Sequence, residues 1–203
     1  MDSQQIENSV SRETLASLRM YEQLLAKWTK RVSLISKRDQ SDIWNRHILD
    51  SLQVWPHLQH ALTVVDFGSG GGLPGLVIAI CQKHENRSGH TTLIESDQRK
   101  CAFLRLVSVE LELPTTIVTD RLEAASIQPS EIATARALAS TSDLLAHAVR
   151  HTSPPHTAFF HKGRLADDEL KAAAKDWSFS VTAHPSKTSA DGVILQFTDI
   201  RAR

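Results

Sequence analysis

The stretch Asp66-Phe67-Gly68-Ser69-Gly70-Gly71-Gly72-Leu73-Pro74-Gly75 decides the fold of this chain. It ends an apolar run over residues 62–67, which is typical of a central parallel strand buried on both faces. Pro74 fits the first turn of a helix, where its missing N–H costs nothing. The stretch therefore predicts a strand, a glycine-rich turn and a helix N-terminus. The backbone N–H groups of such a turn can bind a ligand.

Outward from this turn, segments typical of strands alternate with segments typical of helices. Strands are predicted at residues 62–67, 91–95, 115–119, 132–136 and 157–161, with helices at about 97–111, 142–150 and 165–174. Two last strands, at 177–183 and 193–200, flank a Ser-Ala-Asp-Gly turn. We therefore expect an α/β, Rossmann-like fold with a mostly parallel sheet and one late antiparallel strand.

Residues 1–60 have a different pattern, which predicts helices only. Apolar residues recur at spacings of three and four from Leu15 to Trp28, and a second short helix is expected at about 42–52. We predict an N-terminal helical cap at 1–60 that packs as one unit with a sheet domain at 61–203.

Composition narrows the class of protein further. The chain has 203 residues, with 23 Lys and Arg against 23 Asp and Glu, so bulk charge predicts no nucleic-acid partner. Cys81 and Cys101 lie in apolar segments without metal-ligand spacing, and the ten histidines show no such spacing either. No signal peptide or membrane-length apolar run is visible. We expect a cytoplasmic monomer with no metal and no membrane partner.

The glycine-rich turn is compatible with two cofactor classes. Residues 70–75 satisfy the dinucleotide spelling G-x-G-x-x-G, and residues 66–70 satisfy the S-adenosylmethionine spelling D-x-G-x-G. Glu95, at the end of the second strand, can bind the ribose of either cofactor. Asp66 favours S-adenosylmethionine, because a carboxylate repels a pyrophosphate and attracts the ammonium group of the methionine moiety.

Motifs that are absent from the sequence exclude some classes of methyl-group acceptor. No Pro-Cys dipeptide and no Asn-Pro-Pro or Asp-Pro-Pro motif occurs, which argues against a cysteine nucleophile and against methylation of an exocyclic base amine. Arg136 ends the fourth strand instead and faces the ligand crevice. The N7 atom of guanine needs no general base, so positioning alone can account for its methylation.

These residues resemble a known family. The chain is similar, from about Tyr21 to Ile200, to the RsmG (GidB) family of bacterial 16S rRNA guanine-N7 methyltransferases. The run R-H-I-L-D-S-L at 46–52, followed by G-x-G-G-G-L-P-G at 68–75, carries the likeness most specifically. Further matches are at 27–30, 100–104, 121–123, 134–137 and 162–163.

The resemblance implies a class I S-adenosylmethionine-dependent methyltransferase sheet. Its substrate is a guanine in the 530 loop, around nucleotide 527, of 16S rRNA. Gly68 and Leu73 match loop contacts to the cofactor, Leu122 and Glu123 match the segment near the adenine, and Arg136 matches a cofactor-contacting arginine. With the residues argued above, the predicted cofactor site is Asp66, Gly68, Gly70, Leu73, Glu95, Leu122, Glu123 and Arg136. No general base is expected, and Arg136 is the best candidate for a catalytic role.

The expected partner is 16S rRNA, in the small ribosomal subunit or an assembly intermediate. The residues predicted to face it are Lys27, Lys30, Arg31, Arg46, His47 and Lys162, as contacts to phosphate or base. Two alternatives stay open at this point. One is a non-catalytic RNA- or ribosome-binding module of the same fold, and the other is a small NAD(P)-dependent oxidoreductase.

Overall fold

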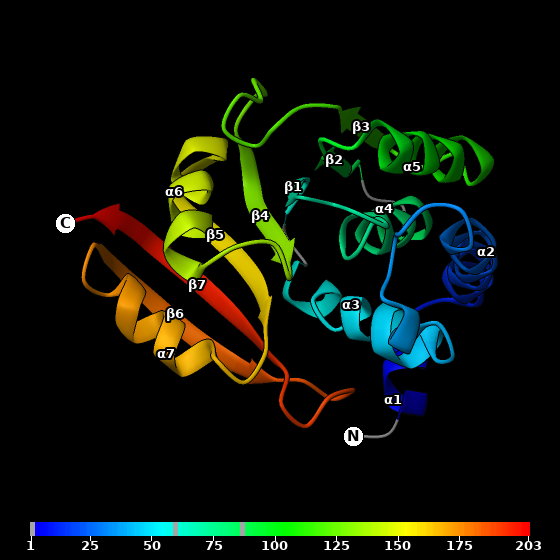
Figure 1. The fold of residues 1–203 in the computed structure, drawn as a ribbon, viewed down its shortest axis with the longest axis horizontal. Coiled ribbons are helices and arrows are strands. Elements are labelled where there is room, and N and C mark those ends of the chain that lie inside the picture. The colour runs from blue at the N-terminus through cyan, green and yellow to red at the C-terminus, as the bar shows by residue number, and fades with distance from the viewer. Residues whose placement is uncertain (1–2, 59–60, 86–87) are drawn as a thin grey trace.

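A computed structural model describes residues 3–58, 61–85 and 88–203 of the chain. A seven-stranded sheet in the order β3-β2-β1-β4-β5-β7-β6 forms its centre (Figure 1). The strands are β1 Thr63–Phe67, β2 His90–Ile94, β3 Thr115–Val118, β4 Ser130–Arg136, β5 Thr152–Lys162, β6 Trp177–Pro185 and β7 Val193–Ala202. Neighbours from β3 to β5 are parallel, and β7 lies antiparallel between β5 and β6. The predicted Rossmann-like sheet with one antiparallel strand is confirmed.

Helices cover both faces of this sheet, as Figure 1 shows. They are α1 Ser3–Glu7, α2 Arg12–Thr29, α3 Asp50–Leu52, α4 Gly75–His84, α5 Gln98–Glu110, α6 Thr141–His151 and α7 Ala166–Ala173. Successive strand residues point to opposite faces. Val64 and Phe159 therefore pack with α4 and α5, whereas Val65 and Phe160 pack with α6 and α7.

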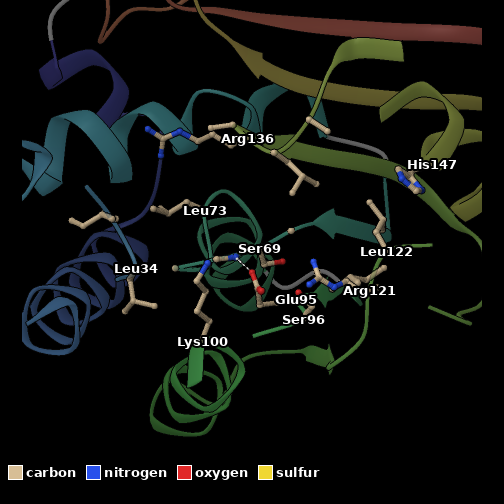
Figure 2. Close-up of a pocket in the computed structure, with 18 of the residues that line it drawn as sticks. Leu34, Ser69, Leu73, Glu95, Ser96, Lys100, Arg121, Leu122, Arg136 and His147 are labelled. Atoms are coloured by element: carbon tan, nitrogen blue, oxygen red, sulfur yellow. Dashed lines mark hydrogen bonds between the residues drawn. The ribbon is translucent and has the colours of Figure 1, made fainter. Parts of the chain in front are cut away.

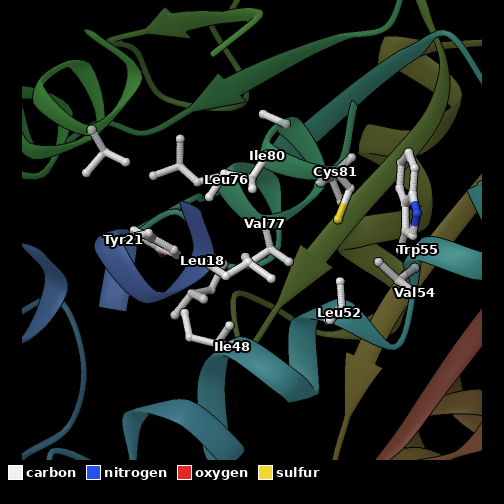
Figure 3. Packing of buried hydrophobic residues seen from close by; sticks show 14 of the residues in the cluster. Leu18, Tyr21, Ile48, Leu52, Val54, Trp55, Leu76, Val77, Ile80 and Cys81 are labelled. Carbon is white, nitrogen blue, oxygen red and sulfur yellow. The ribbon is translucent and has the colours of Figure 1, made fainter. Parts of the chain in front are cut away.

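The N-terminal segment packs over α4 rather than on the sheet itself. Ser11 caps α2 by accepting a hydrogen bond from the backbone N–H of Thr14. Leu18 and other buried side chains of α2 meet the apolar face of α4 (Figure 3). The hydroxyl of Tyr21, which is fully buried, donates to the backbone oxygen of Gly71 at 2.5 Å. The helical segment is thereby fastened to the glycine-rich turn.

The second short helix differs from its predicted form. It is a π-helical segment, η2 Trp44–Leu49, that continues into α3. Short 3₁₀ helices, η1 Lys37–Asp39 and η3 Trp55–Leu58, precede and follow it. Such π-helical turns are frequent at functional sites, and this one carries Arg46 and His47.

The described residues contain neither a helix suited to span a membrane nor a cluster of side chains suited to bind a metal ion. Within residues 3–58, 61–85 and 88–203, no helix is long and apolar enough to cross a membrane. The same part of the chain holds no group of three or more His, Cys, Asp or Glu side chains that could bind a metal ion.

Candidate functional site

The register of the sheet brings three predicted site residues into one row. Phe67 at the end of β1 is level with Ile94 of β2 and Ala135 of β4. The residues that follow these three, Gly68, Glu95 and Arg136, therefore lie side by side at the carboxyl edge of the sheet. Strand order reverses between β1 and β4, and this switch point is where open α/β sheets bind ligands.

A cavity of about 710 Å³ opens over this row (Figure 2). Its volume falls in the usual range for a small-molecule site. Seven of the eight predicted cofactor residues line it: Gly68, Gly70, Leu73, Glu95, Leu122, Glu123 and Arg136. Figure 2 places Glu95 between Leu122 on one side and Leu73 on the other, so the cavity extends to both sides of Glu95.

Hydrogen bonds to the backbone fix the orientation of Glu95. One carboxylate oxygen accepts from the N–H of Gly70 at 2.9 Å, and the other accepts from the N–H of Asp97 at 2.8 Å. Gly70 has φ +55°, a conformation that glycine adopts without the strain of a side chain. Each oxygen keeps a further lone pair for a ligand hydroxyl group. The loop and the acidic residue therefore form one rigid unit.

The prediction that Asp66 lines this cavity is wrong. Its side chain is fully buried, and one carboxylate oxygen accepts from the Thr134 hydroxyl at 2.7 Å. The other oxygen faces the start of α4, where a Cβ on Gly75 would lie only 2.8 Å away. Burial raises the pKa of Asp66 to about 6, with the nearby Glu95 adding to the increase. Asp66 supports the turn from beneath and does not reach a ligand in the cavity.

Arg136 is held between two neighbouring elements. Its Nε lies 3.3 Å from a carboxylate oxygen of Asp50, and its Nη2 donates to the backbone oxygen of Arg46 at 2.6 Å. The Asp50 carboxylate also accepts from the Thr188 hydroxyl at 2.8 Å, which ties in the β6–β7 loop. Arg46 and Asp50 thus position the guanidinium directly, and Thr188 contributes by holding Asp50.

The N-terminal segment supplies a wall of the cavity that sequence reasoning missed. Leu34, Ile35, Ser36, Asp39 and His47 all line it. His47, which was predicted to contact RNA, is buried at this wall rather than exposed on the outer surface, and its contact with RNA stays a prediction. The R-H-I-L-D-S-L run did single out His47, but the sequence carried no signal for its neighbours. His147 of α6 lines the cavity beside Leu122 (Figure 2) and was also missed.

A second cavity of about 460 Å³ adjoins the first and shares Arg136, Ala137 and Ala139 with it. Five cationic side chains line it, Arg38, Arg46, Arg136, Lys162 and Arg164, against the acidic Asp50, Glu169 and Asp191. Its lining is therefore positive in balance.

Lys162 lines this second cavity, but its ammonium group is already bound to other residues of the chain. Its Nζ is 2.6 Å from a carboxylate oxygen of Glu169 and donates to the backbone oxygen of Ala139 at 2.8 Å. Only 8% of the side chain is exposed. In this arrangement Lys162 holds the loop after β4 in place.

The remaining predicted RNA contacts lie outside both cavities or at their edge. Lys27, Lys30 and Arg31 are exposed where α2 ends, and neither cavity includes them. Arg46 is half-exposed, and its Nε lies 2.7 Å from a carboxylate oxygen of Asp39. Trp44, whose role the sequence left open, is buried and donates from Nε1 to Glu7 at 2.7 Å.

Comparison with known proteins shows the family to which the chain belongs. A family model described as rRNA small subunit methyltransferase G matches residues 14–195. A ribosomal RNA small subunit methyltransferase G from Acidiphilium cryptum is 45% identical over 201 residues, covering 98% of this chain and 91% of its own length. The protein of the same description from Paramagnetospirillum magneticum is 41% identical over 194 residues, covering 95% and 92%.

Solved structures show the same fold at low identity. A putative O-methyltransferase from Klebsiella pneumoniae superposes with a TM-score of 0.60 at 13% identity, covering 90% of each chain. An O-methyltransferase from Bacillus cereus, solved in complex with SAH, gives a TM-score of 0.59 at 12% identity, covering 95% of this chain and 99% of its own.

Proposed function

Because the chain belongs to the rRNA small subunit methyltransferase G family, we propose that it transfers a methyl group from S-adenosylmethionine to N7 of a guanine in the 530 loop of 16S rRNA. The observation that supports this most is the 710 Å³ cavity at the switch point of the sheet, with Glu95 fixed across the glycine-rich turn. We place the reaction in the cytoplasm, on the small ribosomal subunit or its assembly intermediate. The helical cap at 1–60 and the sheet domain at 61–203 act as one unit.

The residues present fit an adenosine-containing cofactor. Leu122 and His147 lie at one end of the cavity (Figure 2) and, with the lining residue Glu123, are suited to the adenine, while Glu95 is suited to the ribose hydroxyl groups. Leu34, Leu73 and Arg136 line the other end of the cavity, where the methionine moiety of such a cofactor would lie. When bound, S-adenosylmethionine supplies an electrophilic methyl group.

The chain's contribution to the reaction is positioning. N7 of guanine has a lone pair and no proton, so no side chain has to act as general base. Arg136 belongs to the lining of both cavities, and Asp50 and the Arg46 carbonyl hold its guanidinium there. We assign Arg136 a place beside both ligands, where it contacts the cofactor and orients the acceptor nucleotide next to it.

RNA docking is assigned to the positive second cavity and to the exposed cations near it. With a formal net charge of zero, the chain depends on such a local patch to attract RNA. Arg38, Arg46 and Arg164 are exposed at this cavity and can contact phosphates. Lys27, Lys30 and Arg31 extend the cationic surface along the end of α2.

The test is methyl transfer by the Arg136→Ala variant. Purified small subunits lacking native modification are incubated with methyl-labelled S-adenosylmethionine, and label in 16S rRNA is counted. The rate should fall by roughly 100-fold, as when one preorganised group is removed from a reaction site, while the circular dichroism spectrum is retained. Arg150→Ala, on the exposed face of α6, is the matched control and should keep the wild-type rate. A rate unchanged by Arg136→Ala contradicts the role given to this residue, and absence of label with wild-type protein contradicts the function.

A further inference from the structure

Leu138, in the loop between β4 and α6, is a large apolar side chain that is exposed at the cofactor cavity. It is 43% exposed and belongs to the lining of that cavity. Single exposed leucines are common on protein surfaces and by themselves indicate nothing. Among the large apolar side chains exposed in the part of the chain that the structure describes, however, Leu138 is the one that lines either cavity. Its apolar surface is therefore available to a ligand at the site.

Leu138 stands where the two cavities meet. Its neighbours in sequence, Ala137 and Ala139, line both the cofactor cavity and the positive second cavity. Its side chain lies over the glycine-rich turn, since a Cβ placed on Gly68 would collide with both methyl groups of Leu138. A nucleotide that docks in the second cavity and reaches towards the cofactor therefore passes beside Leu138.

The loop that carries Leu138 is fixed on both sides. Before it, Arg136 is bound by residues of the helical cap. After it, the Lys162 ammonium donates to the backbone oxygen of Ala139 at 2.8 Å, and Glu169 accepts from the first backbone N–H of α6 at 2.9 Å. Because Lys162 and Glu169 also bind each other, the loop is attached to a closed set of contacts. Leu138 is thus exposed on a loop whose backbone is held in place.

The backbone just before Leu138 is strained. Ala137 has φ +51°, in the left-handed region that residues with a side chain rarely adopt. Such conformations persist only where the surrounding structure enforces them, and they are concentrated at sites that bind ligands. The strained residue sets the direction in which the chain leaves β4, and it thereby determines where Leu138 lies.

We propose that Leu138 lies against the ring face of the acceptor guanine and keeps its N7 in line with the methyl group. Enzymes that act on a base hold it between apolar or aromatic side chains, and the cations of the second cavity suit the phosphates of the same nucleotide. An apolar surface beside several cations therefore fits a nucleotide. The inference rests on the proposed function and deepens it by naming a residue that positions the acceptor.

Single-turnover methyl transfer to unmodified small subunits separates positioning from docking. At saturating subunits and cofactor, Leu138→Ala should lower the rate about tenfold, because the base loses the contact that holds it in line. The dissociation constant for subunits should stay within about threefold, since phosphate contacts dominate docking. Leu138→Met, which keeps an apolar side chain of similar size, should retain most of the rate. Val109→Ala, at an exposed position of α5 that lines neither cavity, is the matched control and should keep the wild-type rate.

Two further measurements distinguish contact with the base from contact with the cofactor. Titration calorimetry should give dissociation constants for S-adenosylhomocysteine within about threefold of wild type in both Leu138 variants, because Glu95 and the glycine-rich turn hold the cofactor independently. Benzoylphenylalanine incorporated at position 138 should crosslink on irradiation to 16S rRNA of bound subunits. Reverse transcription of that RNA should stop beside the guanine that the wild-type protein methylates, and the same label at position 109 should give no stop there.

Several results would overturn the inference. They are an unchanged rate for Leu138→Ala, equal losses for Leu138→Ala and Leu138→Met, a loss of S-adenosylhomocysteine affinity as large as the loss of rate, and crosslinks confined to other nucleotides. Absence of methyl transfer by the wild-type protein would instead refute the proposed function.

Discussion

Replacement of Asp66 by Asn tests the structural role given to this carboxylate. Asp66 has no exposed surface, and one of its carboxylate oxygens accepts a hydrogen bond from the Thr134 hydroxyl. The Asn side chain has the same shape and keeps an oxygen that accepts from Thr134. It carries no charge, so the substitution removes the cost of burying the ionised form while leaving the packing of the turn against α4 intact.

The size of this free-energy cost follows from the raised pKa of Asp66. A shift of the Asp66 pKa from 3.8 to about 6 corresponds to about 3 kcal/mol between the two protonation states. Because the folded state holds its proton to higher pH than the unfolded state, the free energy of unfolding falls as pH rises through this window. The penalty is absent below pH 3.8 and complete above about pH 6. The Asp66→Asn variant has no ionisable group at this position, so this penalty is absent at every pH.

The assay is urea unfolding of both proteins between pH 4.5 and 7.5. The free energy of unfolding of the variant, minus that of wild type, should rise by about 2 kcal/mol or more across this range. Asp167→Asn, at an exposed position of α7, serves as control and should show a difference that does not change with pH in this way. A pH-independent difference for Asp66→Asn, or one that falls as pH rises, would refute the reasoning.

Two further predictions concern buried groups outside the cofactor cavity. Lys162→Met should lower the free energy of unfolding by roughly 2 kcal/mol, because it leaves the partly buried Glu169 without its cation. It should also speed amide exchange in residues 137–140, measured by mass spectrometry, and unchanged exchange would contradict the positioning role. Cys81 and Cys101 are fully buried, and burial raises the pKa of the Cys81 thiol, so neither should react with an aromatic disulfide reagent in the native state. Both should react in urea, and rapid native labelling would count against the described core.

The half of the site that belongs to the sheet could be predicted from the sequence. Strand–turn–helix patterns locate the carboxyl ends of β1, β2 and β4, and residues just past those ends must share one edge. Gly68, Glu95 and Arg136 were placed correctly for this reason. Asp66 was misplaced because it is still within β1, where alternation turns it towards α4 together with Val64. The overlooked signal was Gly75, the first residue of α4, whose lack of a side chain leaves room for the Asp66 carboxylate.

The half of the site that comes from the helical cap could not be predicted in the same way. Which face of residues 34–47 meets the cavity depends on long-range packing, including the hydrogen bond from Tyr21 to the glycine-rich turn. Local periodicity predicts that these residues are helical or irregular but not what they touch. The R-H-I-L-D-S-L run indicated function at His47, yet its burial at the cavity wall is a property of the assembled fold.

The most direct test of the central claim is to map the methylated nucleotide. Small subunits and naked 16S rRNA without native modification are each treated with the protein and S-adenosylmethionine, and N7-methylguanine is located by chemical cleavage of the RNA chain. We predict cleavage at a single guanine in the 530 loop. Cleavage elsewhere, or none on either substrate while S-adenosylhomocysteine still binds, would contradict the assignment.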